Sequence, residues 1–91
     1  MNKERRLKLN SLLQKLEQNM AELQDINEQL KEIAEAEREA YDNMPEGLQQ
    51  SDKGYQAEAA ADALDEALSQ LEDSVMYGMQ ECIDNITVAT E

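Results

Sequence analysis

The chain has 91 residues, which is one domain at most. It carries 21 Asp and Glu against eight Lys and Arg, for a net charge of −13, and it has no His, Trp or Phe. Without His there is no imidazole for a metal site or for general-base catalysis, and a single Cys cannot form a disulfide framework. Nucleic acids and anionic lipids bind cationic surfaces, and no run of about 18 apolar residues is present. We therefore expect no cofactor, no metal, no direct binding to nucleic acid and no membrane span.

Residues 1–8 form the only cationic patch, and helical apolar spacing follows them to about residue 43. This predicts one long helix over about residues 3–43. Its core positions recur every seven residues, at Leu9, Leu16, Leu23 and Leu30. Three further apolar residues widen the stripe on one flank, which suits a bundle better than a two-stranded coiled coil: Leu12, Ile26 and Ile33. Asn27 falls on a core position, where a polar side chain can fix register at some cost in stability.

The segment from residue 43 to residue 54 breaks this pattern. Pro45 disfavours the helical conformation at the residue before it, and Gly47 and Gly54 punctuate the loop. Ser51 or Asp52 is a good N-cap for a following helix, and Pro45 also suits the first position of a short helical turn. We expect a loop over residues 44–51. Its marked residues are Tyr41, Pro45, Gly47, Leu48 and Tyr55, and the two tyrosines are expected to cover the end of the bundle.

A second helix is predicted over about residues 52–86, with a frayed tail at residues 87–91. Its core positions are Leu64, Leu68, Leu71 and Val75. The stripe continues through Met79, Cys82 and Ile86 after a drift of about one position near Gly78. Cys82 is therefore expected to be a small buried hydrophobe.

Two helices of similar length joined by a Pro/Gly loop predict an all-α fold, a long antiparallel helical hairpin of the coiled-coil kind. A hairpin of this size covers only one face of each helix, and a chain this short buries a small fraction of its surface. We therefore expect a second copy to pair with it and form a dimeric four-helix bundle.

Several known functional motifs do not fit the charge or the spacing of this sequence. The leucine repeat behind a basic leader is unlike a DNA-binding zipper, because four cations are too few and the rest of the chain repels a duplex. The acidic cluster at residues 62–73 has neither the ligand spacing nor the Gly of an EF-hand loop. No phosphate-binding loop or nucleophile elbow occurs. We expect no enzymatic activity, and a catalytic or metal-binding protein is only a formal alternative.

Charge is the most suggestive feature of the sequence. Residues 46–91 contain eleven acidic residues and one Lys, a net of −10, whereas residues 1–45 have a net of −3. A rigid acidic rod can occupy a basic groove and compete with nucleic acid for it. The residues expected to bind such a partner are Glu58, Asp62, Asp65, Glu66, Glu72 and Asp73. The alternative is that the charge serves only solubility.

The stretch EREAYDNMPEGLQQSDKGYQAEAAADALDEALSQLED (residues 37–73) resembles small acidic helical-hairpin proteins of phages and prophages from Gram-positive bacteria, most specifically at AYDNMPEGLQQS. That family is functionally uncharacterised, so the resemblance assigns no active residues. It implies a phage setting in the cytoplasm of a bacterial host, where small acidic helical proteins include inhibitors of nucleic-acid-handling defence complexes, anti-CRISPR proteins among them. Together with the net charge of −10 in residues 46–91, this setting leads us to expect a non-catalytic inhibitor that blocks the basic groove of a host protein. A scaffolding coiled coil of phage assembly or replication is the alternative.

Overall fold

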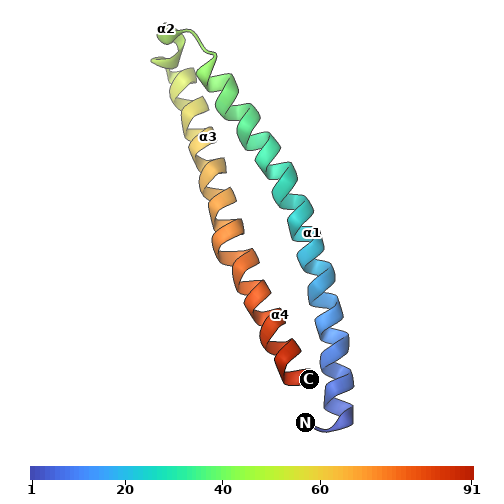
Figure 1. Cartoon of the computed structure of the whole chain (residues 1–91). Coiled ribbons are helices and arrows are strands. Elements are labelled where there is room, and N and C mark those ends of the chain that lie inside the picture. Colours follow the sequence, from blue (N-terminus) through green and yellow to red (C-terminus); the bar gives the residue numbers. More distant parts are fainter.

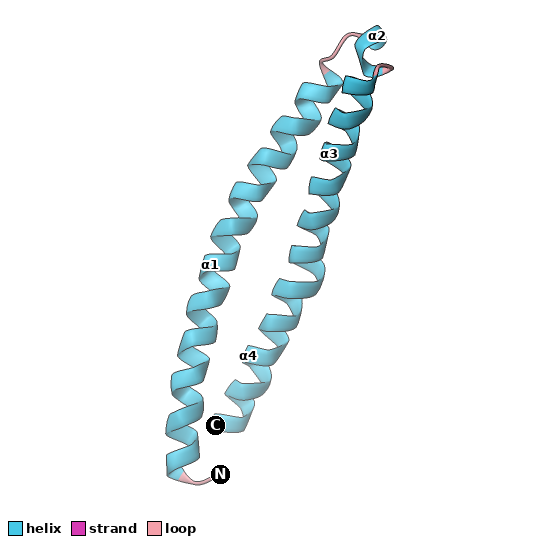
Figure 2. Cartoon of the chain, turned by 180° about the vertical axis from the view of Figure 1, so that it is seen from behind, coloured by secondary structure: helices cyan, strands magenta, loops and turns pink.

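The computed structural model describes residues 1–91 and contains only helices and short turns. Helix α1 (Lys3–Asp42) leads to a short helix α2 (Glu46–Gln49), and the chain then returns through α3 (Asp52–Gln70), a π-helix η1 (Leu71–Met76) and α4 (Tyr77–Thr90). The last three elements are continuous and form what we call the second arm. α1 and the second arm lie antiparallel, with both termini at one end and α2 at the other (Figures 1 and 2). The molecule is a rod of 68 × 16 × 15 Å, and the predicted all-α helical hairpin is confirmed.

α1 runs for 40 residues without Gly or Pro, in a segment rich in strong helix formers. Its N-cap is Asn2, whose Oδ1 accepts a hydrogen bond from the backbone N–H of Arg5 at 2.8 Å. The helix ends at Asp42, because Pro45 biases the residue before it away from the helical conformation. The carbonyl oxygen of Tyr41 accepts from the backbone N–H of Met44 at 3.1 Å and also from Gln49 Nε2 at 2.9 Å, which ties the end of the helix to α2.

The turn between the arms contains the short helix α2, which follows Pro45. Gly47 lies in α2, and Gly54 lies in the first turn of α3. Ser51 caps α3, and its Oγ accepts from the N–H of Gly54 at 3.3 Å. A Cβ at Gly54 would overlap the carbonyl oxygens of Leu48 and Gln49, and Gly54 is buried. The role of this glycine is therefore close packing of α2 against α3.

The arms meet along a seam whose residues alternate in steps of four and three, as in coiled coils. On α1 the seam consists of buried or half-buried side chains: Leu9, Leu13, Leu16, Met20, Leu23, Asn27, Leu30 and Ala34. On the second arm it begins with Ala57, Ala61, Leu64, Leu68 and Leu71. The most deeply buried apolar side chains of the hairpin are Met20, Ala34, Ala61 and Ile83. Leucine at a seam position thus stays half-buried, because only one neighbouring helix covers it.

The π-helix shifts the seam by one residue. Continuing the spacing past Leu71 would place Val75, Gly78 and Cys82 in the seam, but the covered positions of the structure are Met76, Met79, Ile83, Ile86 and Thr90. A π-turn closes i→i+5 hydrogen bonds and so accommodates one extra residue. The expected drift exists, but it lies at η1 and not near Gly78. Val75 and Cys82 therefore lie outside the seam of the single hairpin, contrary to the predicted stripe: Val75 is 48% exposed and Cys82 is exposed.

The C-terminal residues are helical where the sequence predicts a frayed tail. α4 continues to Thr90, and Ile86 and Thr90 are half-buried. Thr87 Oγ1 donates to the carbonyl oxygen of Ile83 at 2.8 Å, and Thr90 Oγ1 donates to that of Thr87 at 3.0 Å. The last turn is therefore held by its own hydroxyl groups and by the continuing seam.

Candidate functional site

The seam divides the hairpin into two long sides of different chemistry. Because the arms run in opposite directions, residues one position before a seam residue lie on one side of both arms. Residues one position after a seam residue lie on the other side, as does Arg38, which is one helical turn after Ala34. The apolar members of the first set, which define the apolar side, are Leu12, Ile26, Ile33, Ala60, Ala67, Val75 and Cys82. On α1 the same rule also gives polar residues, which lie among or beside them: Lys8, Lys15, Asn19, Glu22 and Gln29. The second set, which defines the polar side, is Lys31, Arg38, Glu58, Asp65 and Glu72.

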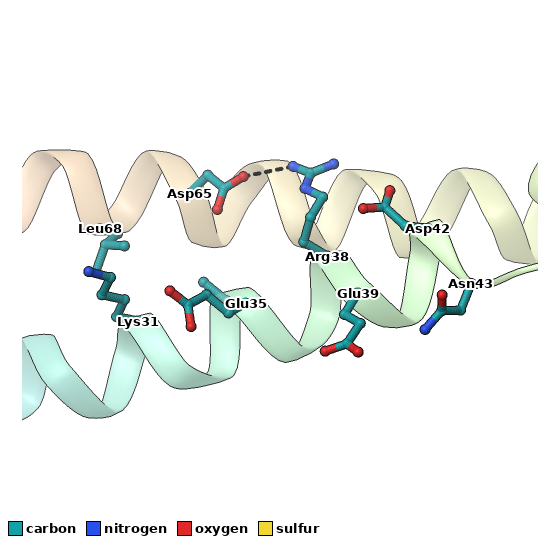
Figure 3. Close-up of a pocket in the computed structure, with 9 residues that line it drawn as sticks. Lys31, Glu35, Arg38, Glu39, Asp42, Asn43, Asp65 and Leu68 are labelled. Carbon is teal, nitrogen blue, oxygen red and sulfur yellow. Dashed lines mark hydrogen bonds and ion pairs between the residues drawn. The ribbon is translucent and has the colours of Figure 1, made fainter.

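On the polar side, Arg38 of α1 joins two carboxylates of α3. Its Nη2 donates to Asp62 Oδ1 and to Asp65 Oδ2, both at 2.7 Å, and Figure 3 shows the bond to Asp65. The two hydrogen bonds raise the pKa of Arg38 above its usual value, so the guanidinium stays charged at any working pH. Exposed ion pairs of this kind contribute little stability, so the main effect of this pair is to align the arms.

Glu58 and Glu72 lie seven residues on either side of Asp65 and also bind α1. Glu58 Oε2 accepts from the hydroxyl of Tyr41 at 3.1 Å, and Glu72 Oε1 accepts from Nδ2 of Asn27 at 3.1 Å. The hydrogen bond to Glu58 raises the pKa of Tyr41, because a phenolate there would face a carboxylate. These three carboxylates form a ladder along one edge of the second arm. The carboxylate ladder therefore contacts α1 at three levels along the hairpin.

This arrangement divides the six acidic residues that the sequence marks for partner binding. Four of them bind α1, although only Glu58 is half-buried and the other three are exposed: Glu58, Asp62, Asp65 and Glu72. The other two, Glu66 and Asp73, are exposed and make no hydrogen bond to α1, although Asp73 accepts one from Ser69 at 3.0 Å. Sequence reasoning missed the ladder, although the spacing of seven residues between its carboxylates is visible in the sequence.

An open groove of about 570 Å³ lies on the polar side toward the loop (Figure 3). It is lined by Lys31, Ala34, Glu35, Arg38, Glu39, Asp42, Asn43, Asp65 and Leu68. Two cations and four carboxylates share this lining with only two apolar side chains, which is unlike the enclosed apolar sites of small ligands. No three His, Cys, Asp or Glu side chains in the protein are grouped so that they could hold a metal ion. The groove therefore offers a charged surface and no evident chemistry.

The net charge also differs between the two halves of the folded hairpin. The hydrogen bonds from Asn27 to Glu72 and from Tyr41 to Glu58 fix which levels of the two antiparallel arms face each other. About one helical turn further from the loop, residue 24 of α1 lies near residue 76 of the second arm. Residues 24–76, on the loop side of that level, hold 15 acidic and three basic residues, a net of −12. Residues 1–23 and 77–91 hold six acidic and five basic residues, a net of −1. We call residues 24–76 the acidic segment and the remainder the open end. The net charge is therefore uneven along the rod as well as between the arms, because the basic N-terminus lies beside the end of the second arm.

The marked loop residues gather at the tip of the hairpin. Tyr41 is half-buried against Glu58, and Pro45 immediately precedes α2. Gly47 and Leu48 are exposed on α2, and Tyr55 is 59% exposed. Tyr41 thus contacts the second arm, whereas Tyr55 points to solvent and does not cover the end of this single hairpin.

Comparisons with protein-family models, with curated proteins and with solved structures find no match to this chain. None of its helices combines the length and the apolar character that a bilayer crossing requires. Its function is therefore inferred from its residues and their geometry.

Proposed function

We propose that this chain is a non-catalytic protein–protein interaction module that dimerises and presents its acidic segment to a basic partner. The observation that carries this proposal is the concentration of a net −12 in residues 24–76 of a straight, narrow rod. A charged rod attracts a groove of opposite sign and raises the association rate, and its occupancy excludes other ligands from that groove.

The charge density suggests which ligand the rod resembles. The acidic segment extends about 35 Å along the rod, from 19 residues of α1 at about 1.5 Å each plus the turn. It therefore carries about one net negative charge per 3 Å. A single nucleic-acid strand carries one per about 3.4 Å, whereas a duplex carries one per about 1.7 Å. This comparison favours a partner whose groove holds a single strand.

We further propose that the partner is a nucleic-acid-handling defence protein of a bacterial host, and that this protein acts as its inhibitor in the host cytoplasm. Support comes from the resemblance of AYDNMPEGLQQS and its flanks to phage and prophage hairpins, together with the charge density above. In this role the hairpin would occupy the basic groove without any catalytic step.

The test must neutralise carboxylates outside the ladder, because a change in a ladder residue would alter both the charge and a contact between the arms. Glu32→Gln, Glu35→Gln and Glu39→Gln change exposed residues of the acidic segment. A matched control removes the same charge from the open end and consists of Glu17→Gln, Glu22→Gln and Glu81→Gln. Gln and Glu have similar helix propensities, so both variants keep the fold.

Each immobilised protein is exposed to a host lysate, and the bound proteins are eluted with salt or with single-stranded DNA. We expect the wild type and the control to retain a partner that elutes between about 50 and about 200 mM salt. Single-stranded DNA should displace this partner, and the variant of the acidic segment should fail to retain it. Retention that ignores salt, or equal loss in both variants, would show that the charge of the acidic segment is not the recognition element.

The second candidate function is a scaffolding coiled coil of phage assembly or replication, whose charge serves only solubility. The exposed tip favours it, since Leu48 and Tyr55 present apolar surface there. A partner lost on Leu48→Ala and Tyr55→Ala, but retained by the charge variants, would support this candidate.

A further inference from the structure

A column of large apolar side chains on the apolar side of α1 is left uncovered. Leu12, Ile26 and Ile33 are 52%, 51% and 55% exposed, and each directly precedes a seam residue, which places all three on the same flank of the seam. On the same side of the second arm, Val75 and Cys82 are also exposed. Both arms therefore contribute apolar groups to one strip of surface, which Asn19 interrupts between Leu12 and Ile26, while the opposite side carries the carboxylate ladder.

The area of the molecule indicates that this strip needs a cover. The accessible surface is 6597 Å², whereas a compact monomer of 10.3 kDa has about 5,400 Å². The excess of about 1,200 Å² exceeds the roughly 800 Å² that each partner buries in a stable interface of standard size. One side of a rod 68 Å long and 16 Å wide presents about 1,000 Å², so a partner of equal length covers enough area for stable association.

We propose that a second copy of this chain packs on the apolar side with its loop at the opposite end, which gives an antiparallel four-helix bundle. This inference rests on the dimerisation proposed above and does not depend on the acidic partner. A second copy fits the strip because it has the same length and the same column of apolar groups, as a two-fold interface requires. Packing of the two strips would bury Leu12, Ile26 and Ile33 of both copies at the centre of the bundle.

Charge decides the orientation of the two hairpins. A parallel pair would place two acidic segments of net −12 side by side, and like charges at that range repel. An antiparallel pair sets each acidic segment mainly against an open end of net −1. It also brings Arg5, which lies in the same column as Leu12, toward the acidic loop end of the other copy. The antiparallel bundle thus covers the apolar strip with the least repulsion.

The interface is tested by sedimentation equilibrium of the purified chain at tens of micromolar. The paired substitutions Ile26→Gln and Ile33→Gln should raise the dimer dissociation constant by about a hundredfold or more, since four apolar side chains per dimer lose their cover. Glu28→Gln and Glu35→Gln, which follow the seam by one residue on the polar side, should leave the dimer intact. A monomeric wild type, or an isoleucine variant that dimerises like the control, would overturn the proposal.

The relative orientation of the two hairpins is measured in a variant that keeps Ile26 and Ile33. This measurement therefore does not depend on whether the isoleucine variant stays folded. Gly47→Cys in a Cys82→Ser background places one nitroxide label at the tip, where an added Cβ meets no atom within 4 Å. Electron–electron distances should fall near 60 Å, close to the 68 Å length of the rod. Distances below about 30 Å, or two rod widths, would show parallel hairpins and refute the antiparallel bundle. Both measurements use the chain alone, so their failure is separate from failure of the acidic-partner proposal.

Discussion

Replacing Gly54 with Ala should destabilise the hairpin, although Ala is the better helix former. In an exposed helix interior, the same change stabilises by about 1 kcal/mol. At Gly54 the new Cβ would overlap the carbonyl oxygens of Leu48 and Gln49 and lie 2.5 Å from the carbonyl carbon of Gln49. These are backbone atoms that cannot rotate away, so α2 must move off α3.

The magnitude follows from the contacts that this movement disturbs. Forcing extra volume into a packed site costs about 1–3 kcal/mol. Moving α2 also strains the hydrogen bond from Gln49 Nε2 to the carbonyl oxygen of Tyr41, and such a bond is worth about 1 kcal/mol. After the gain in helix propensity is subtracted, Gly54→Ala should lower the free energy of unfolding by about 1–3 kcal/mol.

Gly78 provides a matched control in the same arm. A Cβ added there meets no atom within 4 Å, so Gly78→Ala should raise the free energy of unfolding by about 0.5–1 kcal/mol. Both variants are compared with the wild type by urea unfolding, followed by circular dichroism at one fixed chain concentration, because the proposed dimerisation would make stability depend on concentration. Changes of the same sign at the two glycines would refute the packing role assigned to Gly54.

Ile83→Ala should lower the free energy of unfolding by about 2–4 kcal/mol because that side chain is buried, whereas Cys82→Ala should lower it by less than about 1 kcal/mol. Equal losses in urea unfolding would contradict the shifted seam. Asn27→Leu should stabilise the hairpin by about 1 kcal/mol in the same assay, because Asn27 Oδ1 is buried without a hydrogen-bond partner. A loss of stability would show that the hydrogen bond from Asn27 Nδ2 to Glu72 outweighs the cost of the unpaired oxygen. The raised pKa of Tyr41 means that its contribution is fully present below the ordinary value of 10.0 and is lost as pH rises through the pKa of the folded state. Thermal melts above pH 10 should therefore show a weaker pH dependence for Tyr41→Phe than for the wild type, and parallel declines would exclude this role of the tyrosine.

Much of the architecture is readable from the sequence because it depends on near neighbours in the chain. The steps of four and three between apolar residues of α1 are a property of one helix, and they predict both its extent and its buried face. Pro45 restricts the residue before it by direct steric contact, so the break between the arms is equally local. Net charge is a sum over residues and needs no structure.

The register of the second arm was decided only when the arms paired. Val75 and Met76 are both apolar, so the pattern permits either in the seam, and contact with α1 selects Met76 through the extra residue of η1. Gly54 appears in the sequence as a turn residue, and only the position of α2 gives it a packing role. Likewise, Arg38 reaches Asp62 and Asp65, 24 and 27 residues along the chain, only because the hairpin folds back. Spacing along one helix determines which side chains share a face, whereas contact between distant segments determines what that face meets.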